Sequence, residues 1–200
     1  MSALSDNFFR CTIETIEKID KSKIEKLASA INLLRKRKGR LFFFGVGGSA
    51  GNCSHAVNDF RKLCNVESYC VTDNVSEITA RINDEGWENS YVDWFKSSFP
   101  KKNDAVFVMS VGGGSLEKKL SVNLVKLIQY ARKNRNKVFS IVGPNGGYAG
   151  KNSDVCIKLP VNDKKFITPQ VESLQVLIWH FLVTHPKLKK IKLCGNMISK

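Results

Sequence analysis

The chain has 200 residues, 42% of them hydrophobic, and 32 lysines and arginines against 18 acidic residues give it a formal net charge of +14. This length fits one α/β domain with a full core, and no apolar stretch reaches the roughly 18 residues of a membrane helix. The polar N-terminus shows no signal peptide. We therefore expect a cytoplasmic protein without a membrane partner, and we expect its six cysteines, which lack CxxC spacing, to be reduced and mostly structural.

The basic residues are scattered, with clusters at 18–26, 35–40, 132–137 and 187–192. Such a surface is able to bind nucleic acid through electrostatics. No basic motif interleaved with aromatic residues and no recognition helix accompanies it. The sequence therefore favours a solvated, lysine-rich surface that attracts an anionic substrate, and it does not favour a nucleic-acid partner.

Helical and strand patterns alternate along the chain. Helices are predicted at 4–36 (one or two), 49–64, 75–82, 87–98, 117–134 and 169–184, and strands at 41–45, 67–72, 105–110, 137–142 and 154–159. Apolar strands separated by helices predict an α/β fold with a parallel sheet covered on both faces. The chain divides into an N-terminal helical region (1–39), an α/β domain (40–186) and a basic tail (187–200).

An apolar stripe runs along the N-terminal helical region. Such a stripe covers either the sheet or a partner subunit, and it therefore points to an oligomer. Its members are Ile13, Ile16, Ile19, Ile24, Leu27, Ile31 and Leu34.

The stretch from Arg40 to Asp59, RLFFFGVGGSAGNCSHAVND, combines a buried strand, a glycine turn and a helix N-terminus. Glycines such as Gly48 let the backbone approach a ligand, and unpaired N–H groups at the helix start bind anions. His55 and Asp59 are four residues apart, so they share one helix face and are able to bind a metal. A tight turn with a solvent-facing histidine and aspartate remains an open alternative.

A second glycine loop follows the run 105–110, AVFVMS. Gly112, Gly113 and Gly114 allow a nest of backbone N–H groups, and Ser110 and Ser115 add hydroxyl donors, which together suit a phosphate. Neither loop matches a Walker or dinucleotide motif, which argues against a nucleoside triphosphate or NAD. Because ligands of parallel sheets bind beyond the carboxyl ends of the strands, we expect both loops to share one pocket.

The last predicted helix carries Glu172, Gln175 and His180 after the start signal Thr168-Pro169. Glu172 and His180 are eight residues apart, about 12 Å along the helix, so they are able to flank a site but not to form an i, i+4 pair. A core position is the alternative for His180. For His185 we expect a role at the helix end.

Five blocks in this order resemble the sugar isomerase (SIS) domain family, and within it the phosphoheptose isomerases, over about residues 40–185. The blocks are GVGGSAGNCSHAVND, VSEITARINDEGW, VMSVGGGS, GPNGGYAGKNSDVCIKLP and ITPQVESLQVLIWH. The resemblance implies a three-layer α/β/α sandwich with a five-stranded parallel sheet, of flavodoxin-like type. It also implies a homotetramer with sites between subunits, a phosphorylated sugar as substrate and, as in many members, zinc.

The resemblance also assigns residues. The family's metal and acid–base positions fall on His55, Asp59, Glu172 and His180, with Asp59, Glu172 and His180 as the catalytic candidates. The substrate contacts, together with the loop glycines, are Gly48, Ser49, Asn83, Asp84, Ser110, Gly112, Gly113, Gly114 and Ser115, where Asn83-Asp84 matches a turn that approaches the sugar.

Four departures from the family pattern leave the general base and the substrate open. The family's usual glutamate is Asp59, its glutamine is Glu172, its mid-loop serine is Gly112, and one of its histidines is Gln175. Two carboxylates and two imidazoles are still present, a set that suits Zn²⁺.

The function that the resemblance implies is the conversion of sedoheptulose 7-phosphate to D-glycero-D-manno-heptose 7-phosphate through an enediolate. A non-catalytic sugar-phosphate-binding regulator and an isomerase of another phosphosugar are the alternatives. Turnover by the purified protein separates the enzyme from the regulator.

Overall fold

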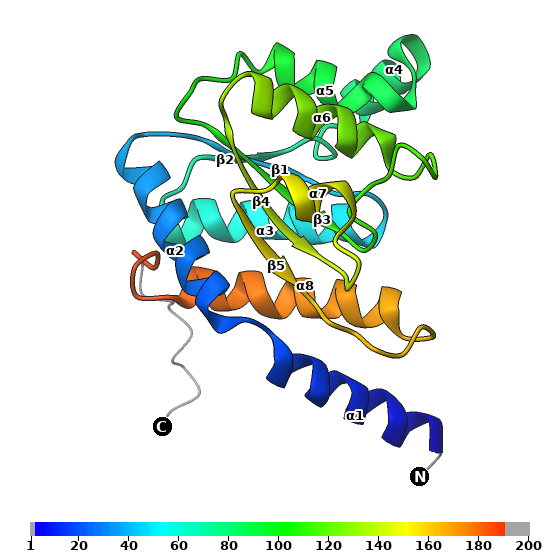
Figure 1. The fold of residues 1–200 in the computed structure, drawn as a ribbon. Coiled ribbons are helices and arrows are strands. Elements are labelled where there is room, and N and C mark those ends of the chain that lie inside the picture. Colours follow the sequence, from blue (N-terminus) through cyan, green and yellow to red (C-terminus); the bar gives the residue numbers. More distant parts are fainter. Residues whose placement is uncertain (1–2, 191–200) are drawn as a thin grey trace.

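A computed structural model describes residues 3–190 and shows helices alternating with strands (Figure 1). The helices are α1 (Ala3–Lys18), α2 (Lys21–Lys36), α3 (Gly48–Cys64), α4 (Val75–Glu85), α5 (Trp87–Ser97), α6 (Val122–Lys133), α7 (Gly147–Asn152) and α8 (Ile167–Thr184). The strands are β1 (Leu41–Phe44), β2 (Ser68–Cys70), β3 (Ala105–Ser110), β4 (Lys137–Val142) and β5 (Val155–Lys158).

The five strands form one parallel sheet in the order β2-β1-β3-β4-β5. Strands β1 and β3 are buried along their whole length, which explains why they read as continuous apolar runs. Phe43 of β1 pairs with Phe107 of β3, and their rings stack with centroids 4.9 Å apart. The predicted α/β class and five-stranded parallel sheet are confirmed.

Helices cover both faces of the sheet (Figure 1). Successive side chains of a strand point to opposite faces. Phe43 therefore joins the core formed with α2, α3 and α8, whereas Phe42 and Phe44 join the core formed with α5 and α6. The result is the predicted three-layer sandwich.

The N-terminal apolar stripe is split between two helices. In α2, Leu27 and Ile31 are fully buried against the domain. Helix α1 extends away from the sheet, and its Ile13 is 58% exposed (Figure 1). Hydrogen bonds from Asn7 to Asp163 and from Cys11 to Asn162 tie α1 to the loop before α8. The stripe thus covers the domain through α2 and leaves apolar side chains of α1 exposed.

Two predicted helix starts are wrong, and one short helix was missed. Helix α6 begins at Val122 rather than 117, because 115–120 folds into a turn in which Ser115 and Leu120 exchange two backbone hydrogen bonds of 2.8 and 3.0 Å. The short helix α7 was not predicted. Helix α8 begins at Ile167, so Thr168 is not its cap. Pro169 still lies in the first turn, where a missing N–H loses no intrahelical bond.

Other sequence predictions concern cysteines, membrane spans and the tail. The cysteines at 11, 53, 64, 70 and 156 are free, and Cys70 and Cys156 lie in strands. No helix within residues 3–190 is both long and apolar enough to span a bilayer. Cys194 and most of the basic tail lie outside the described residues.

Candidate active site

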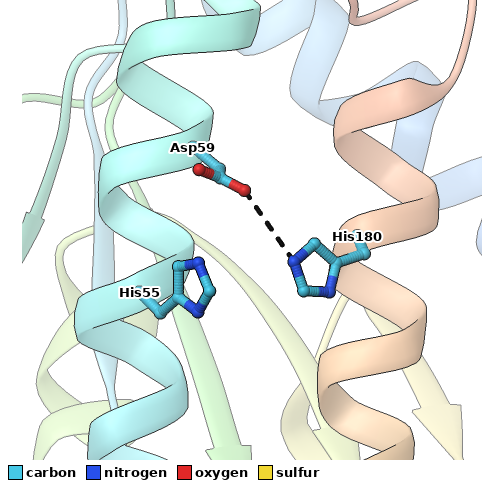
Figure 2. Close-up of side chains that lie close together, drawn as sticks. All are labelled: His55, Asp59 and His180. Carbon is cyan, nitrogen blue, oxygen red and sulfur yellow. Dashed lines mark ion pairs between the residues drawn. The ribbon is translucent and has the colours of Figure 1, made fainter. Parts of the chain in front are cut away.

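His55 and Asp59 lie one turn apart on α3 and face His180 of α8 (Figure 2). The Nε2 atom of His180 lies 3.9 Å from Oδ2 of Asp59, and the two imidazole rings have centroids 5.4 Å apart and are nearly perpendicular. The side chain of His180 is 46% exposed. The alternative of a core histidine is therefore wrong for His180, and its ring is available for chemistry.

Packing between α3 and α8 fixes this arrangement. The Nδ2 group of Asn52 donates to the backbone oxygen of Glu172 at 2.9 Å and to Oε1 of Gln175 at 3.0 Å. The fully buried Trp179 contacts both histidines, with ring centroids 4.7 Å from His55 and 3.6 Å from His180. The two helices therefore cannot slide past each other without breaking buried contacts.

The three side chains form a group with the chemistry of a zinc site. One donor atom from each of His55, Asp59 and His180 lies within 4.8 Å of the others. Nitrogen and oxygen ligands of tetrahedral zinc lie about 2.0–2.2 Å from the metal, and therefore about 3.4 Å from one another. Side-chain movements of about 1 Å would close the group onto a metal. The residue types fit zinc.

Glu172, the fourth predicted ligand, lies elsewhere. Its carboxylate sits against Gly48 at the start of α3, where a β-carbon built on Gly48 would lie 2.4 Å from Oε2. Two buried polar atoms of the same helix pair, the hydroxyl of Ser49 and Nε2 of Gln175, have no hydrogen-bond partner among the described residues. This end of the α3–α8 contact thus presents unsatisfied donors and a carboxylate.

The second glycine loop forms a pocket of about 530 Å³. Gly113 and Gly114 have positive φ angles of 72° and 80°, as predicted for a tight loop. The nest of backbone N–H groups in this loop is partly occupied, because the N–H of Gly113 donates to Oγ of Ser110 at 3.0 Å. The lining residues are Gly112, Gly114, Ser115, Leu116, Glu117, Lys118, Leu120, Ser121, Asn145, Gly147, Tyr148 and Lys151.

Sequence reasoning missed Lys118, Tyr148 and Lys151 in this pocket. Helix α7 holds the loop, since backbone N–H groups of Tyr148 and Ala149 donate to the carbonyls of Gly114 and Gly113, both at 2.8 Å. The Gly-Gly pair at 146–147, separated by three residues from the end of the strand 137–142, is the signal that would have revealed a third loop at this edge.

Comparisons with known proteins find similar chains. No family model matches the chain. It is 33% identical to the lincomycin biosynthesis protein LmbN of Streptomyces lincolnensis over 144 residues, which are 69% of this chain but only about half (52%) of that relative. It is 25% identical to the phosphoheptose isomerase of Rhodospirillum rubrum over 164 residues, covering 80% of this chain and 81% of the relative.

The fold is shared with a solved phosphoheptose isomerase from Francisella tularensis. That structure superposes with a TM-score of 0.77 over 92% of this chain and 97% of its own, at 20% identity. The chain is similar to phosphoheptose isomerases in sequence and in fold. A further relative, from Roseiflexus, is also named a phosphoheptose isomerase and is 24% identical over 195 residues.

The predicted Asn83-Asp84 turn is not a turn. Both residues lie in the last helical turn of α4, they are exposed, and Nδ2 of Asn83 donates to Oδ1 of Asp84 at 2.7 Å. Within residues 3–190, no hydrogen bond or ion pair joins either side chain to any of the other predicted site residues. His185 is the C-cap residue of α8, as expected, but its Nε2 pairs with Glu25 at 3.2 Å rather than capping carbonyls.

Proposed function

We propose that the protein is a phosphosugar isomerase that converts sedoheptulose 7-phosphate to D-glycero-D-manno-heptose 7-phosphate. The observation that carries the proposal is the group His55, Asp59 and His180 in a chain related to phosphoheptose isomerases. The same fold without these side chains would support only binding.

The reaction moves one proton between adjacent carbons. A base removes a proton from C1 of the ketose, the enediolate forms, and the proton is returned to C2 while the C2 oxygen is protonated and the C1 hydroxyl gives up its proton, so that the aldehyde forms. Each transfer requires a group within hydrogen-bond reach. In the metal-free group His180 serves as one proton carrier, with Asp59 3.9 Å away, and Glu172 or Asp59 serves as the other. When zinc holds the group, Glu172 is the carrier that lies outside it.

The phosphate group occupies the pocket between the second glycine loop and α7. Lys118 and Lys151 supply positive charge there, and Ser115 and Ser121 supply hydroxyl groups. Binding energy from this remote group holds the reacting carbons in position. Because the N–H of Gly113 is already bonded to Ser110, these side chains contribute more of the phosphate binding than the sequence alone predicts.

We also propose that His55, Asp59 and His180 bind zinc. Zinc, when bound, polarises the substrate's carbonyl oxygen and stabilises an enediolate. His55 is assigned as a zinc ligand, because it lies beside Asp59 and His180 and its ring has no hydrogen-bond partner among the described residues. Glu172 lies outside the group, so it remains available as a base.

A homotetramer is the proposed assembly. Helices α1 and α8 expose Phe9, Ile13, Leu177 and Phe181 to between 47% and 65%. These side chains leave an apolar surface that a second copy would bury. A site that lies on α3 and α8 then stands close to an interface.

NMR of the purified protein with sedoheptulose 7-phosphate tests the proposal, with fructose and ribulose phosphates as comparison substrates. We expect an aldose signal from the heptulose, and we expect His180→Gln to lower the rate about a hundredfold or more. The melting temperature of His180→Gln should match wild type, because the ring is half exposed. Binding of these ketoses without turnover would favour the regulatory alternative.

A further inference from the structure

Three basic segments that are distant in sequence meet where the strands begin, in the turns that follow α2, α5 and α6 (Figure 1). We call residues 36–40, 99–104 and 132–137 the basic edge. Asparagine side chains bind the turns together. Asn103 donates to the carbonyl oxygen of Arg37 at 3.3 Å, and Asn136 donates to that of Lys101 at 2.7 Å.

Few carboxylates balance the charge of the basic edge. Asp104, which is buried, pairs with Arg40 at 2.7 Å. Asp154, directly before the neighbouring strand β5, pairs with Arg132 at 2.9 Å and Lys137 at 2.8 Å. The remaining cations are exposed and have no ion-pair partner within residues 3–190: Lys36, Arg37, Lys38, Lys101, Lys102, Lys133 and Arg135.

Helix ends do not cancel this charge. Three helices end at the basic edge, and each C-terminus carries about half a negative charge. The positive charge of the unpaired cations is several times the negative charge of the three helix ends. Because the asparagine contacts hold their backbones together, the charges add over a small surface and attract a polyanion.

An exposed aromatic ring lies among these cations. Phe99 is 83% exposed, and its φ angle of 47° is rare for a residue with a side chain. Nη2 of Arg40 donates to the carbonyl of Phe99 at 3.0 Å, and Nδ2 of Asn134 donates to the next carbonyl, that of Pro100, at 3.4 Å. The backbone is thus held in a conformation that keeps the ring in solvent.

We propose that the basic edge binds single-stranded nucleic acid. Cations that follow a phosphate backbone, next to an aromatic face on which an unpaired base stacks, are the combination that single-strand-binding surfaces use. A pocket of about 270 Å³, lined in part by Arg37, Lys102 and Arg135, would receive the phosphate backbone. The sequence disfavours this partner because it separates Phe99 from most of the cations that the fold gathers around it.

The basic edge lies at the opposite end of the strands from the glycine loops. The loops follow the carboxyl ends of β1 and β3, whereas the basic edge precedes the amino ends of β1, β3 and β4. Nucleic-acid binding would therefore leave the proposed isomerase site open. This inference goes beyond the proposed function and does not depend on it.

Fluorescence anisotropy with a labelled 12-nucleotide oligo-uridine, the matching oligo-thymidine and a duplex of the same length tests the proposal. For about four phosphate contacts, the logarithm of the affinity for single strands should fall with the logarithm of salt concentration with a slope of about −3. A chain of charge +14 attracts any polyanion at low salt, so the variants below decide the location.

The charge variant is Lys101→Glu with Lys102→Glu, and its matched control is Lys164→Glu with Lys165→Glu on the loop that follows β5. Both pairs are exposed and change the net charge equally. We expect the first pair to weaken oligo-uridine binding about tenfold or more, and the control to change it less than about threefold. Turnover of a sugar phosphate should not differ between the charge variant and wild type.

Variants of Phe99 test whether the basic edge prefers single strands to duplex. Phe99→Ala should weaken binding of both single strands about fivefold or more without weakening duplex binding, and Phe99→Tyr should keep wild-type affinity. Removing a ring that is 83% exposed should leave the melting temperature unchanged. No single-strand binding at 50 mM salt, equal losses in the two charge variants, or no effect of Phe99→Ala would each overturn the proposal.

Discussion

A single methyl group at Gly48 should separate activity from stability. Gly48 is the first residue of α3, and the carboxylate of Glu172 occupies the space where its β-carbon would be. In Gly48→Ala that carbon would lie 2.4 Å from Oε2, 2.6 Å from Cδ and 2.7 Å from Oε1 of Glu172. These separations are far below van der Waals contact, so the carboxylate must move by about 1 Å or more.

The fold should tolerate this movement. Glu172 is a flexible side chain, its carboxylate makes no hydrogen bond within residues 3–190, and Gly48 does not have a positive φ angle. Alanine in place of a helical glycine stabilises by about 0.5–1 kcal/mol. We therefore expect a melting temperature equal to or slightly above that of wild type. Because a displacement of about 1 Å costs a proton-transfer group about a hundredfold, kcat should fall 10- to 100-fold.

Gly51→Ala is the matched control, because Gly51 lies in the same turn of α3 and a β-carbon there meets nothing within 4 Å. It should give the same stabilisation with wild-type kcat. NMR turnover assays and thermal melts of both variants measure the two effects. Wild-type kcat in Gly48→Ala would refute a catalytic role for Glu172, and a parallel loss of stability would refute the local account of the change.

Four further predictions concern the rest of the molecule. Ser115→Asp should abolish the thermal stabilisation by sugar phosphates, since it places a negative charge in the proposed phosphate pocket; a surviving shift would locate the phosphate elsewhere. Elemental analysis of protein made without a histidine tag should find zinc, and less of it in His55→Ala; equal contents would argue against the site. Light scattering should report a tetramer at micromolar concentration, whereas a species near 22.4 kDa would refute the assembly. Hydrogen bonds from Cys53 and, to a smaller extent, from Thr72 lower the pKa of the Cys70 thiol to about 7, although the thiol is buried. Iodoacetamide labelling of Cys70 through the adjacent surface pocket should therefore rise with a midpoint near pH 7. Burial raises the pKa of Cys64 to about 11, and it should stay unlabelled below pH 9; identical profiles would contradict this difference.

The sheet and most helices could be predicted because their signals are local. Each buried strand is a short apolar run, and the Phe42-Phe43-Phe44 stretch shows no alternation because both faces of the strand are covered. Helix α7 could not be predicted, because it depends on backbone bonds between loops that lie far apart in the sequence. The start of α6 was predicted too early, because the local turn at 115–120 has no distinct sequence period. The hydrogen bonds that Gly113 and Gly114 accept from the turn of α7 leave no periodic pattern.

The candidate site was predicted in part. The i, i+4 spacing placed His55 and Asp59 on one face of α3, and family resemblance added His180. Glu172 and His180 lie eight residues apart on α8, about 12 Å along the helix, so they do not ligate the same metal ion, and the structure places Glu172 at Gly48. The basic edge was not predicted, since a sequence gives the number of charged residues but does not show which basic segments come together in the fold.

The contact between α3 and α8 also sets the order in which the protein becomes functional. The side chain of Asn52 on α3 hydrogen-bonds to Glu172 and Gln175 on α8, which lie 120 and 123 positions later in the chain. During synthesis, the histidine and aspartate of α3 therefore emerge long before their partner, and they remain without it until the last helix docks. A nascent chain, or one truncated before Ile167, would leave the apolar side of α3 and the sheet uncovered and would lack His180. Completion of the hydrophobic core and assembly of the site are then the same event.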